Sequence, residues 1–344
     1  VQTLENLEMK KTLVALAALA ATSAFAQSAV TLTGNLDFAY GSAKAGSTSA
    51  EKTIATTNLT SSTSVIKITA TEDLGGGSTA TVQYGIDPRG TSNTGTASPT
   101  RDETFIGLAN ANLGNLRVGA PNSIGLTTFG VSSPFGTGIG GGFGKNTSDF
   151  ASVRLDRSAR YDSPVFNGFS VSALHSDRVG ANVVNTTGVA TPAAITAAAN
   201  TAARTEMGAA YTNGPLNLAF ASIQQSAVGL NAKTAHTLFA GNYTIGATTV
   251  YGSINSGDSI VQAVAATKTK GNSISVKHTI GQIDLLAGLN NQTAAGAAKE
   301  TVTGLRADYN FSKTTATYVG YEKFKAAASA NDQKIMSIGV RKSF

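Results

Sequence analysis

The chain has 344 residues, of which 13% are charged, and it contains neither Cys nor Trp. Soluble domains usually carry about a quarter charged residues, so this composition disfavours an ordinary soluble fold. The net charge of +6 is mild, and no cluster of Lys and Arg is dense enough to indicate nucleic-acid binding. On composition alone, a soluble β-rich adhesin or solenoid stays open as an alternative.

The N-terminal segment has the three-part layout of an export signal. A basic pair follows Met9, and an apolar run then extends from Thr12 to about Ala21. The small-residue pattern Ala24-Phe25-Ala26 comes next, and the run is too short to cross a bilayer as a helix. We therefore expect an upstream translation artefact at 1–8, a cleaved signal peptide at 9–26 and a single β-barrel domain at 27–344.

The segment 30–40 alternates apolar and polar residues with a period of two over eleven residues. That length suits a tilted strand crossing a membrane, whereas strands of soluble sandwiches are typically about 5–6 residues long. Leu174 and Leu286 break the polar face of their segments. Similar alternation recurs at 66–71, 79–86, 116–118, 169–173, 273–280, 283–290, 305–311 and 336–344.

Short and long connections alternate along the chain. Turn chemistry marks short connections at 72–77, 213–215, 244–246, 281–282 and 311–313. Longer polar stretches lie near 41–60, 87–101, 121–151, 176–204, 223–234, 255–271, 291–300 and 325–333. Eight long loops separated by short turns predict an all-β fold, a 16-stranded antiparallel transmembrane β-barrel with short periplasmic turns and long external loops. The sheet must close because lipid cannot satisfy an exposed edge.

Several short motifs in this order resemble the general porins of Gram-negative bacteria, of the type common in β-proteobacteria. They are Ser28–Gly34, Thr71–Gly75, Phe105–Leu108, Arg160–Pro164, Asn167–Phe169 and the terminal Phe344. The resemblance implies a trimeric porin of the outer membrane whose third long loop folds inward to narrow the pore. It also implies that Phe344 is a signal for the outer-membrane assembly machinery.

The third long loop, about Pro121–Ala151, is rich in glycine. Gly136, Gly138 and Gly141 match the spacing of a dinucleotide fingerprint, but neither the required strand before them nor the helix after them is indicated. We therefore expect no cofactor and interpret these glycines as permitting tight folding against the inner wall. A flexible external loop is the alternative. The expected constriction residues are Pro134, Phe135, Gly136, Gly138 and Gly141.

Charged side chains at the narrowest point of a pore select ions. The alternation places more basic than acidic residues on the inner face, which suggests a mild preference for anions. The alternative is that these charges only solvate an aqueous interior. The expected pore-lining residues are Lys67, Arg101, Arg117, Arg154, Arg160, Lys277, Arg306, Arg341 and Asp37, with Glu72, Glu206, Asp284 and Asp308 in the lumen or at its rims.

In the family comparison, Arg160 matches a wall arginine. Thr69, Asp102 and Ala120 stand where relatives often carry basic residues. This difference implies a rearranged or weakened basic wall.

Enzymatic motifs are absent from the sequence. Its three His residues, His175, His236 and His278, have no metal-ligand spacing, and there is no Gly-x-Ser-x-Gly motif. The sequence therefore predicts no enzyme and no metal site. It predicts an outer-membrane channel for passive diffusion of small hydrophilic solutes and ions. A non-conducting adhesin or structural barrel is the alternative. The expected partners are two further copies in a homotrimer, outer-membrane lipid, lipopolysaccharide and the assembly machinery.

Overall fold

The computed structural model describes residues 29–45, 51–55, 64–88, 100–143, 154–177, 203–226, 233–259 and 267–344. The expected signal peptide and the last part of the third long loop, 144–151, lie outside these ranges, as does the side chain of Arg101. Within the described ranges, no helix has the length and apolar character needed to cross a membrane.

Nearly all of the described chain is β-strand. The first nine segments are β1 (Ala29–Ala45), β2 (Glu51–Ala55), β3 (Val65–Gly75), β4 (Ser78–Asp87), β5 (Thr100–Arg101), β6 (Thr104–Asn110), β7 (Gly114–Ala120), β8 (Ser158–Asp162) and β9 (Phe169–Ser176). The others are β10 (Arg204–Asn213), β11 (Leu216–Ser226), β12 (Lys233–Ile245), β13 (Thr248–Asp258), β14 (Lys268–Ile280), β15 (Ile283–Ala294), β16 (Glu300–Ser312), β17 (Thr315–Lys325) and β18 (Gln333–Ser343). One helix, α2 (Ile124–Ser132), follows β7, and a 3-10 turn, η1 (Ser329–Asn331), precedes β18.

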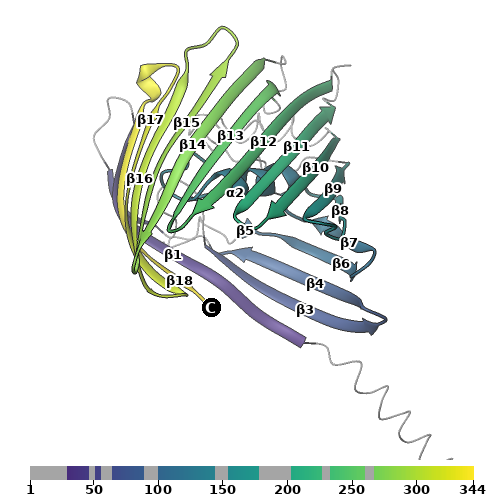
Figure 1. Cartoon of the computed structure of the whole chain (residues 1–344). Helices are drawn as coiled ribbons and strands as arrows, with labels where there is room; N and C mark the ends of the chain where they lie inside the picture. The colour runs from purple at the N-terminus through teal and green to yellow at the C-terminus, as the bar shows by residue number, and fades with distance from the viewer. Residues whose placement is uncertain are drawn as a thin grey trace, which may run out of the picture.

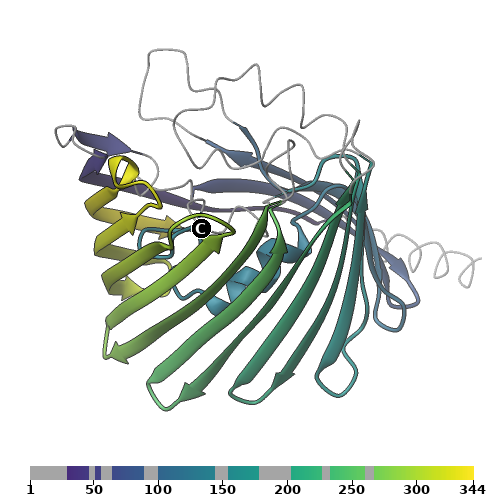
Figure 2. The same cartoon turned by 90° about the horizontal axis from the view of Figure 1, so that it is seen from above.

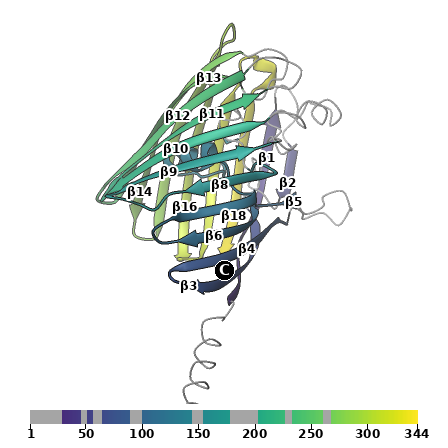
Figure 3. The same cartoon turned by 90° about the vertical axis from the view of Figure 1, so that its right-hand side faces the viewer.

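The strands form one closed antiparallel sheet. β2 and β3 pair with the same side of β1, and β5 and β6 pair with the same side of β4. The eighteen segments are therefore sixteen strands, as the sequence predicts. β1 also pairs with β18, which closes the ring and leaves no sheet edge exposed to lipid. The ring is visible from above in Figure 2, and Figure 3 shows its wall from the side.

The connections at the two rims differ as predicted. One rim carries tight turns, such as those at Gly246 and Gly281, whose φ angles of 58° favour glycine. The other rim carries the long connections, and this difference between the rims is typical of membrane-spanning β-barrels.

The two faces of the sheet differ in polarity. In β18, Met336 and Ile338 are 62% and 54% exposed on the outer face, whereas the intervening Ser337 is 7% exposed. A band of exposed apolar side chains around the outside is what a bilayer requires. The two exceptions to the alternation, Leu174 and Leu286, are buried inside the barrel. Leu174 belongs to a buried cluster with residues of α2, so this break marks a place where the inner wall is covered.

Candidate pore constriction

Residues 121–143, here called the inner loop, enter the barrel after β7, and α2 lies within the ring (Figures 1 and 2). Ser123 caps the helix, because its Oγ accepts a hydrogen bond from the backbone N of Leu126 at 3.0 Å. On the buried side of α2, Ile124 and Phe129 pack in a cluster with wall residues that include Leu174 and Leu238. The helix is therefore fixed to the wall by apolar contacts.

A buried ion pair holds the start of the helix. Glu206 of β10 accepts hydrogen bonds through Oε2 from the backbone N of Ile124 at 2.6 Å and of Gly125 at 3.0 Å. Its other oxygen accepts from Nε of Arg204 at 2.6 Å, and both side chains are at most 1% exposed. The first N–H groups of a helix have no partner within it, so this carboxylate satisfies them and also complements the helix dipole.

A second carboxylate holds the far end of the inner loop. Glu322 of β17 accepts from the backbone N of Gly140 at 2.8 Å and of Gly142 at 3.4 Å. Nearby, Arg306 donates to the carbonyl oxygen of Phe135 at 3.4 Å, with its guanidinium 5.6 Å from the ring centroid. β17 lies seven strands beyond β10 in the ring of sixteen. The inner loop is thus attached to two nearly opposite walls.

Glycines on the inner wall make room for the loop. A Cβ atom at Gly320 would lie 2.6 Å from Cγ2 of Ile139, and one at Gly288 would lie 2.8 Å from Cε2 of Phe135. At Gly304 it would overlap the carbonyl oxygen of Gly140. Because strand glycines often mark close approach of another backbone, these positions are a sequence signal of the loop's path.

The structure places the expected constriction residues inside the barrel. Phe135 is 4% exposed, and successive turn hydrogen bonds join Gly138 N to the carbonyl of Phe135 at 3.0 Å and Gly141 N to that of Gly138 at 3.4 Å. Gly136 has a φ of 58°, which suits glycine. Pro134 begins this series of turns.

A row of alternating charges follows the wall from β3 to β8. Glu103 accepts from Lys67 at 3.4 Å and from Arg117 at 3.1 Å. Asp162 then pairs with Arg117 on one side and with Arg160 at 2.8 Å on the other. Arg117 and Arg160 are directly opposite in the register of β7 and β8, so Asp162 offsets the repulsion between two like charges.

The other expected basic residues whose side chains are described also have acidic partners. Arg306 and Arg341 both pair with Asp308, at 2.8 Å and 3.4 Å. Asp37 accepts a hydrogen bond from Tyr318, and Asp284 lies 3.9 Å from Lys277. Arg154 pairs with Asp102. Each of these basic residues therefore lies beside a carboxylate.

Sequence reasoning missed Glu103, Arg204 and Glu322 as members of this site. Alternation could have found Glu322, which has the same phase in β17 as the inward-facing Tyr318 and Gly320. Glu103 lies at a bend between β5 and β6, where alternation does not assign a face.

In most of these ion pairs, the basic side chain is the more exposed partner. The exposed fractions of the basic and the acidic side chain are 29% and 8% for Lys67 and Glu103, and 25% and 6% for Arg154 and Asp102. They are 36% and 19% for Lys277 and Asp284, and 32% and 4% for Arg341 and Asp308. Asp162 is the exception, since at 23% it is more exposed than both of its arginines. Water inside the barrel therefore meets ammonium and guanidinium groups more than carboxylates.

A closed antiparallel barrel with an apolar exterior, a charged interior and a loop fixed across its inside defines a porin-type transmembrane β-barrel. The family model for Gram-negative porins matches residues 12–329, so the chain belongs to that family and to the outer membrane.

Individual relatives agree with this assignment. An outer membrane porin protein of Bordetella pertussis is 34% identical over 170 residues, which are 46% of this chain and 40% of that relative. The chain thus matches less than half the length of that protein. The anion-selective porin from Comamonas acidovorans is 22% identical with a TM-score of 0.73, covering 92% of this chain and 100% of that one. OmpF of Salmonella typhi, in complex with daunomycin, is 12% identical with a TM-score of 0.68, covering 92% and 97%. These two structures share the fold.

Proposed function

We propose that the protein is a passive diffusion channel for small hydrophilic solutes and ions. The observation that carries this proposal is the inner loop, which is attached by Glu206 and Glu322 to nearly opposite walls of the barrel. A fixed loop across a polar interior narrows the water-filled path. It limits the size of the solutes that can pass, and no reaction is needed.

The channel prefers anions weakly. Each ion pair cancels most of the electrostatic potential of its two charges. Because Lys67, Lys277 and Arg341 are more exposed than their acidic partners, the water in the pore meets a net positive potential. The Comamonas acidovorans protein that shares the fold is an anion-selective porin, which agrees with this sign.

Planar-bilayer recording tests both statements. The refolded protein should give ohmic conductance, and its reversal potential in a KCl gradient should have the sign of modest anion preference. The triple variant Lys67→Gln, Lys277→Gln, Arg341→Gln should lose that preference, whereas Lys342→Gln, at an exposed position near the short turns, should keep it. Absence of ohmic conductance would overturn the channel proposal, and cation preference would overturn the proposed sign.

Maturation and assembly complete the proposal. Residues 9–26 are removed on export, and three copies assemble, as in the trimer form of OmpT from Vibrio cholerae, which shares the fold. The assembly machinery recognises Phe344, whose backbone N and O pair with Gly34 at 3.0 Å and 2.9 Å. Deleting Phe344 should lower the amount of folded protein in outer-membrane fractions, while refolding in detergent persists.

A further inference from the structure

A row of uncharged polar side chains crosses the inner wall near the short turns. Each of its five members is opposite the next in the strand register: Thr212 of β10, Asn217 of β11, Asn242 of β12, Tyr251 of β13 and Ser275 of β14. We call these five residues the neutral row.

The neutral row faces the lumen. Asn217 has the same phase in β11 as the buried Ala219, whereas Phe220 belongs to the exposed outer face. Asn242 donates from Nδ2 to the carbonyl oxygen of Val131, in the last turn of α2, at 2.8 Å. Because α2 packs against β11 and β12 (Figure 1), the row lies between the helix and the short turns. A solute meets it when it enters or leaves the part of the path that the inner loop narrows.

Hydrogen bonds run along the neutral row in one direction. Thr212 donates from Oγ1 to Oδ1 of Asn217 at 3.0 Å, and Asn217 donates from Nδ2 to Oδ1 of Asn242 at 2.9 Å. A carboxamide has two N–H groups and two oxygen lone pairs. In the described contacts, each of the two amides uses one N–H group and one lone pair. Each amide therefore keeps one donor and one acceptor for water or for a solute, and the chain of hydrogen bonds polarises both.

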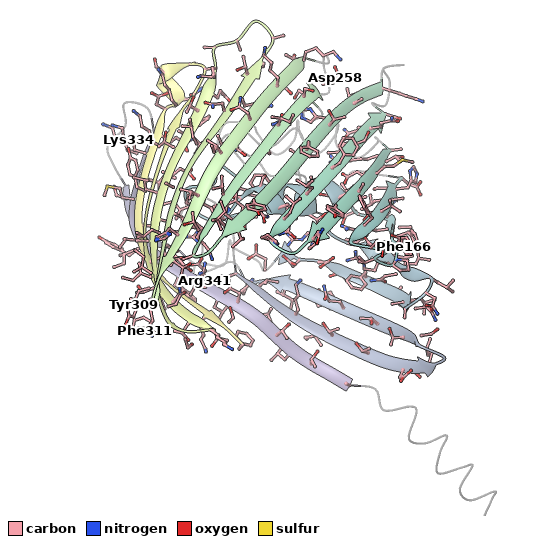
Figure 4. All side chains as sticks on the ribbon, in the orientation of Figure 1. Phe166, Asp258, Tyr309, Phe311, Lys334 and Arg341 are labelled. Atoms are coloured by element: carbon pink, nitrogen blue, oxygen red, sulfur yellow. The ribbon has the colours of Figure 1, made fainter. Side chains whose placement is uncertain are left out.

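The wall around the neutral row is uncharged. No Lys, Arg, Asp or Glu occurs in the described stretches 207–226 and 234–257, which include most of β10 to β13. Charged groups near the short turns lie farther along the ring, at Lys277 of β14, Asp308 of β16 and Arg341 of β18, which Figure 4 labels. Below the inner loop, the lumen therefore has an uncharged side and a charged side.

The two sides differ in how strongly they hold water. Hydrogen bonds to ionised groups are about twice as strong as those between neutral groups. An uncharged solute therefore displaces water from amides and hydroxyl groups at a lower cost than from ion pairs. Neighbouring strands are about 4.8 Å apart, which matches the separation of equatorial hydroxyl groups on alternate carbons of a sugar ring.

We propose that the neutral row is a weak binding site for uncharged polyhydroxyl solutes, namely sugars and polyols. This proposal rests on the proposed channel function. The hydroxyl groups of the solute exchange hydrogen bonds with Asn217, Asn242 and Tyr251 as it passes. Binding that is favourable but weak aids entry and still permits release, so the row raises the flux of such solutes at low concentration. Ions pass along the charged side, so the two classes of solute use different sides of one path.

The test measures the swelling of liposomes that contain the protein, with arabinose and with triethylene glycol. The second solute is uncharged and of nearly equal mass but has fewer hydroxyl groups. The variant is Asn217→Leu, which keeps a branched side chain and leaves the contact of Asn242 with α2 in place. The matched control is Asn115→Leu, which changes a half-buried, inward-facing asparagine of β7 opposite Asp162, near the short turns.

Asn217→Leu should lower the arabinose swelling rate about threefold to tenfold, because the solute loses neutral hydrogen bonds of small net free energy. Its swelling rate with triethylene glycol and its conductance in KCl should equal those of the unchanged protein. Asn115→Leu should swell with arabinose at the unchanged rate. A second arm uses the unchanged protein alone: excess sorbitol should slow the uptake of labelled arabinose, and excess triethylene glycol at equal osmolarity should not.

Four outcomes would overturn the proposal. They are an unchanged arabinose rate in Asn217→Leu, an equal loss with both solutes, an equal loss in Asn115→Leu, and uptake that sorbitol does not slow. An equal loss with both solutes would indicate that the leucine only narrows the path. Absence of conductance in the unchanged protein would instead overturn the channel proposal, so the two failures are distinguishable.

Discussion

Tyr318 of β17 donates a hydrogen bond from its hydroxyl to Oδ1 of Asp37 of β1 at 2.7 Å, passing over β18, the strand between them. Both side chains are at most 3% exposed. Gly339 of β18 is opposite Tyr318 on one side and Ala39 on the other, and any Cβ at Gly339 would overlap the tyrosine ring. One side chain thus joins the last strands to the first across a position that must remain glycine.

Replacing Tyr318 with Phe should lower the free energy of unfolding by about 1–3 kcal/mol, because Asp37 loses a buried hydrogen-bond donor. The measurement is urea-induced unfolding in lipid vesicles. Tyr309→Phe is the matched control, because the Tyr309 hydroxyl bonds Gln282 at the exposed short-turn rim (Figure 4) and its loss should cost less than about 0.5 kcal/mol. Equal effects of the two changes would contradict a special role for the Tyr318 contact.

Gly304→Ala should displace the tip of the inner loop, because the added methyl group overlaps the carbonyl oxygen of Gly140. Overpacking of this kind costs about 1–3 kcal/mol, and we expect an altered single-channel conductance. Gly252→Ala is the control, since the nearest atom to its added carbon is 3.6 Å away. A Gly304→Ala channel with unchanged conductance would show that residues near Gly140 do not narrow the path.

Glu206→Gln should release the start of α2. The change weakens two hydrogen bonds to the helix N-terminus and leaves Arg204 buried without its carboxylate, a loss of about 3–5 kcal/mol. We expect larger current fluctuations in single-channel recordings as the inner loop detaches and rebinds. Asp284→Asn is the control, because it removes a carboxylate whose contacts here are the wall residues Thr279, Asn310 and Lys277. Its single-channel current should show no additional fluctuations. A Glu206→Gln channel without larger current fluctuations would show that Glu206 does not hold the inner loop in place.

Glu103→Gln should increase the preference for anions. The change removes one negative charge and leaves the charges of Lys67 and Arg117 less compensated inside the barrel. The reversal potential in a KCl gradient should shift in the anion direction. Glu72→Gln, an exposed carboxylate near the short turn after β3, should give no shift. A shift toward cations after Glu103→Gln would contradict the charge balance that we infer.

Much of the barrel is predictable from the sequence because strand faces and tight turns depend on residues that are close together in the chain. Period-two alternation assigns the two faces of β18, and Gly-containing turns such as Gly281-Gln282 locate one rim. The count of strands follows from the alternation of short and long connections, and the structure confirms it. Leu174 breaks the alternation of apolar and polar residues because α2 covers it inside the barrel. Such a break therefore indicates where the inner wall is covered.

The partners of the wall charges are less predictable because they depend on contacts between distant segments. Glu206 is 82 residues from Ile124, and Glu322 is 182 residues from Gly140. Alternation gives the face on which such a carboxylate lies but not the backbone that it meets. The sequence therefore predicts a charged interior, whereas the division of those charges between pairing and loop attachment needs the three-dimensional structure.

The attachment of one loop at two distant points of the wall has a mechanical consequence. The inner loop acts as a strut between β10 and β17, so ovalisation of the barrel in that direction must strain the hydrogen bonds to Glu206 and Glu322. The shape of the cross-section in that direction therefore depends on two buried carboxylates.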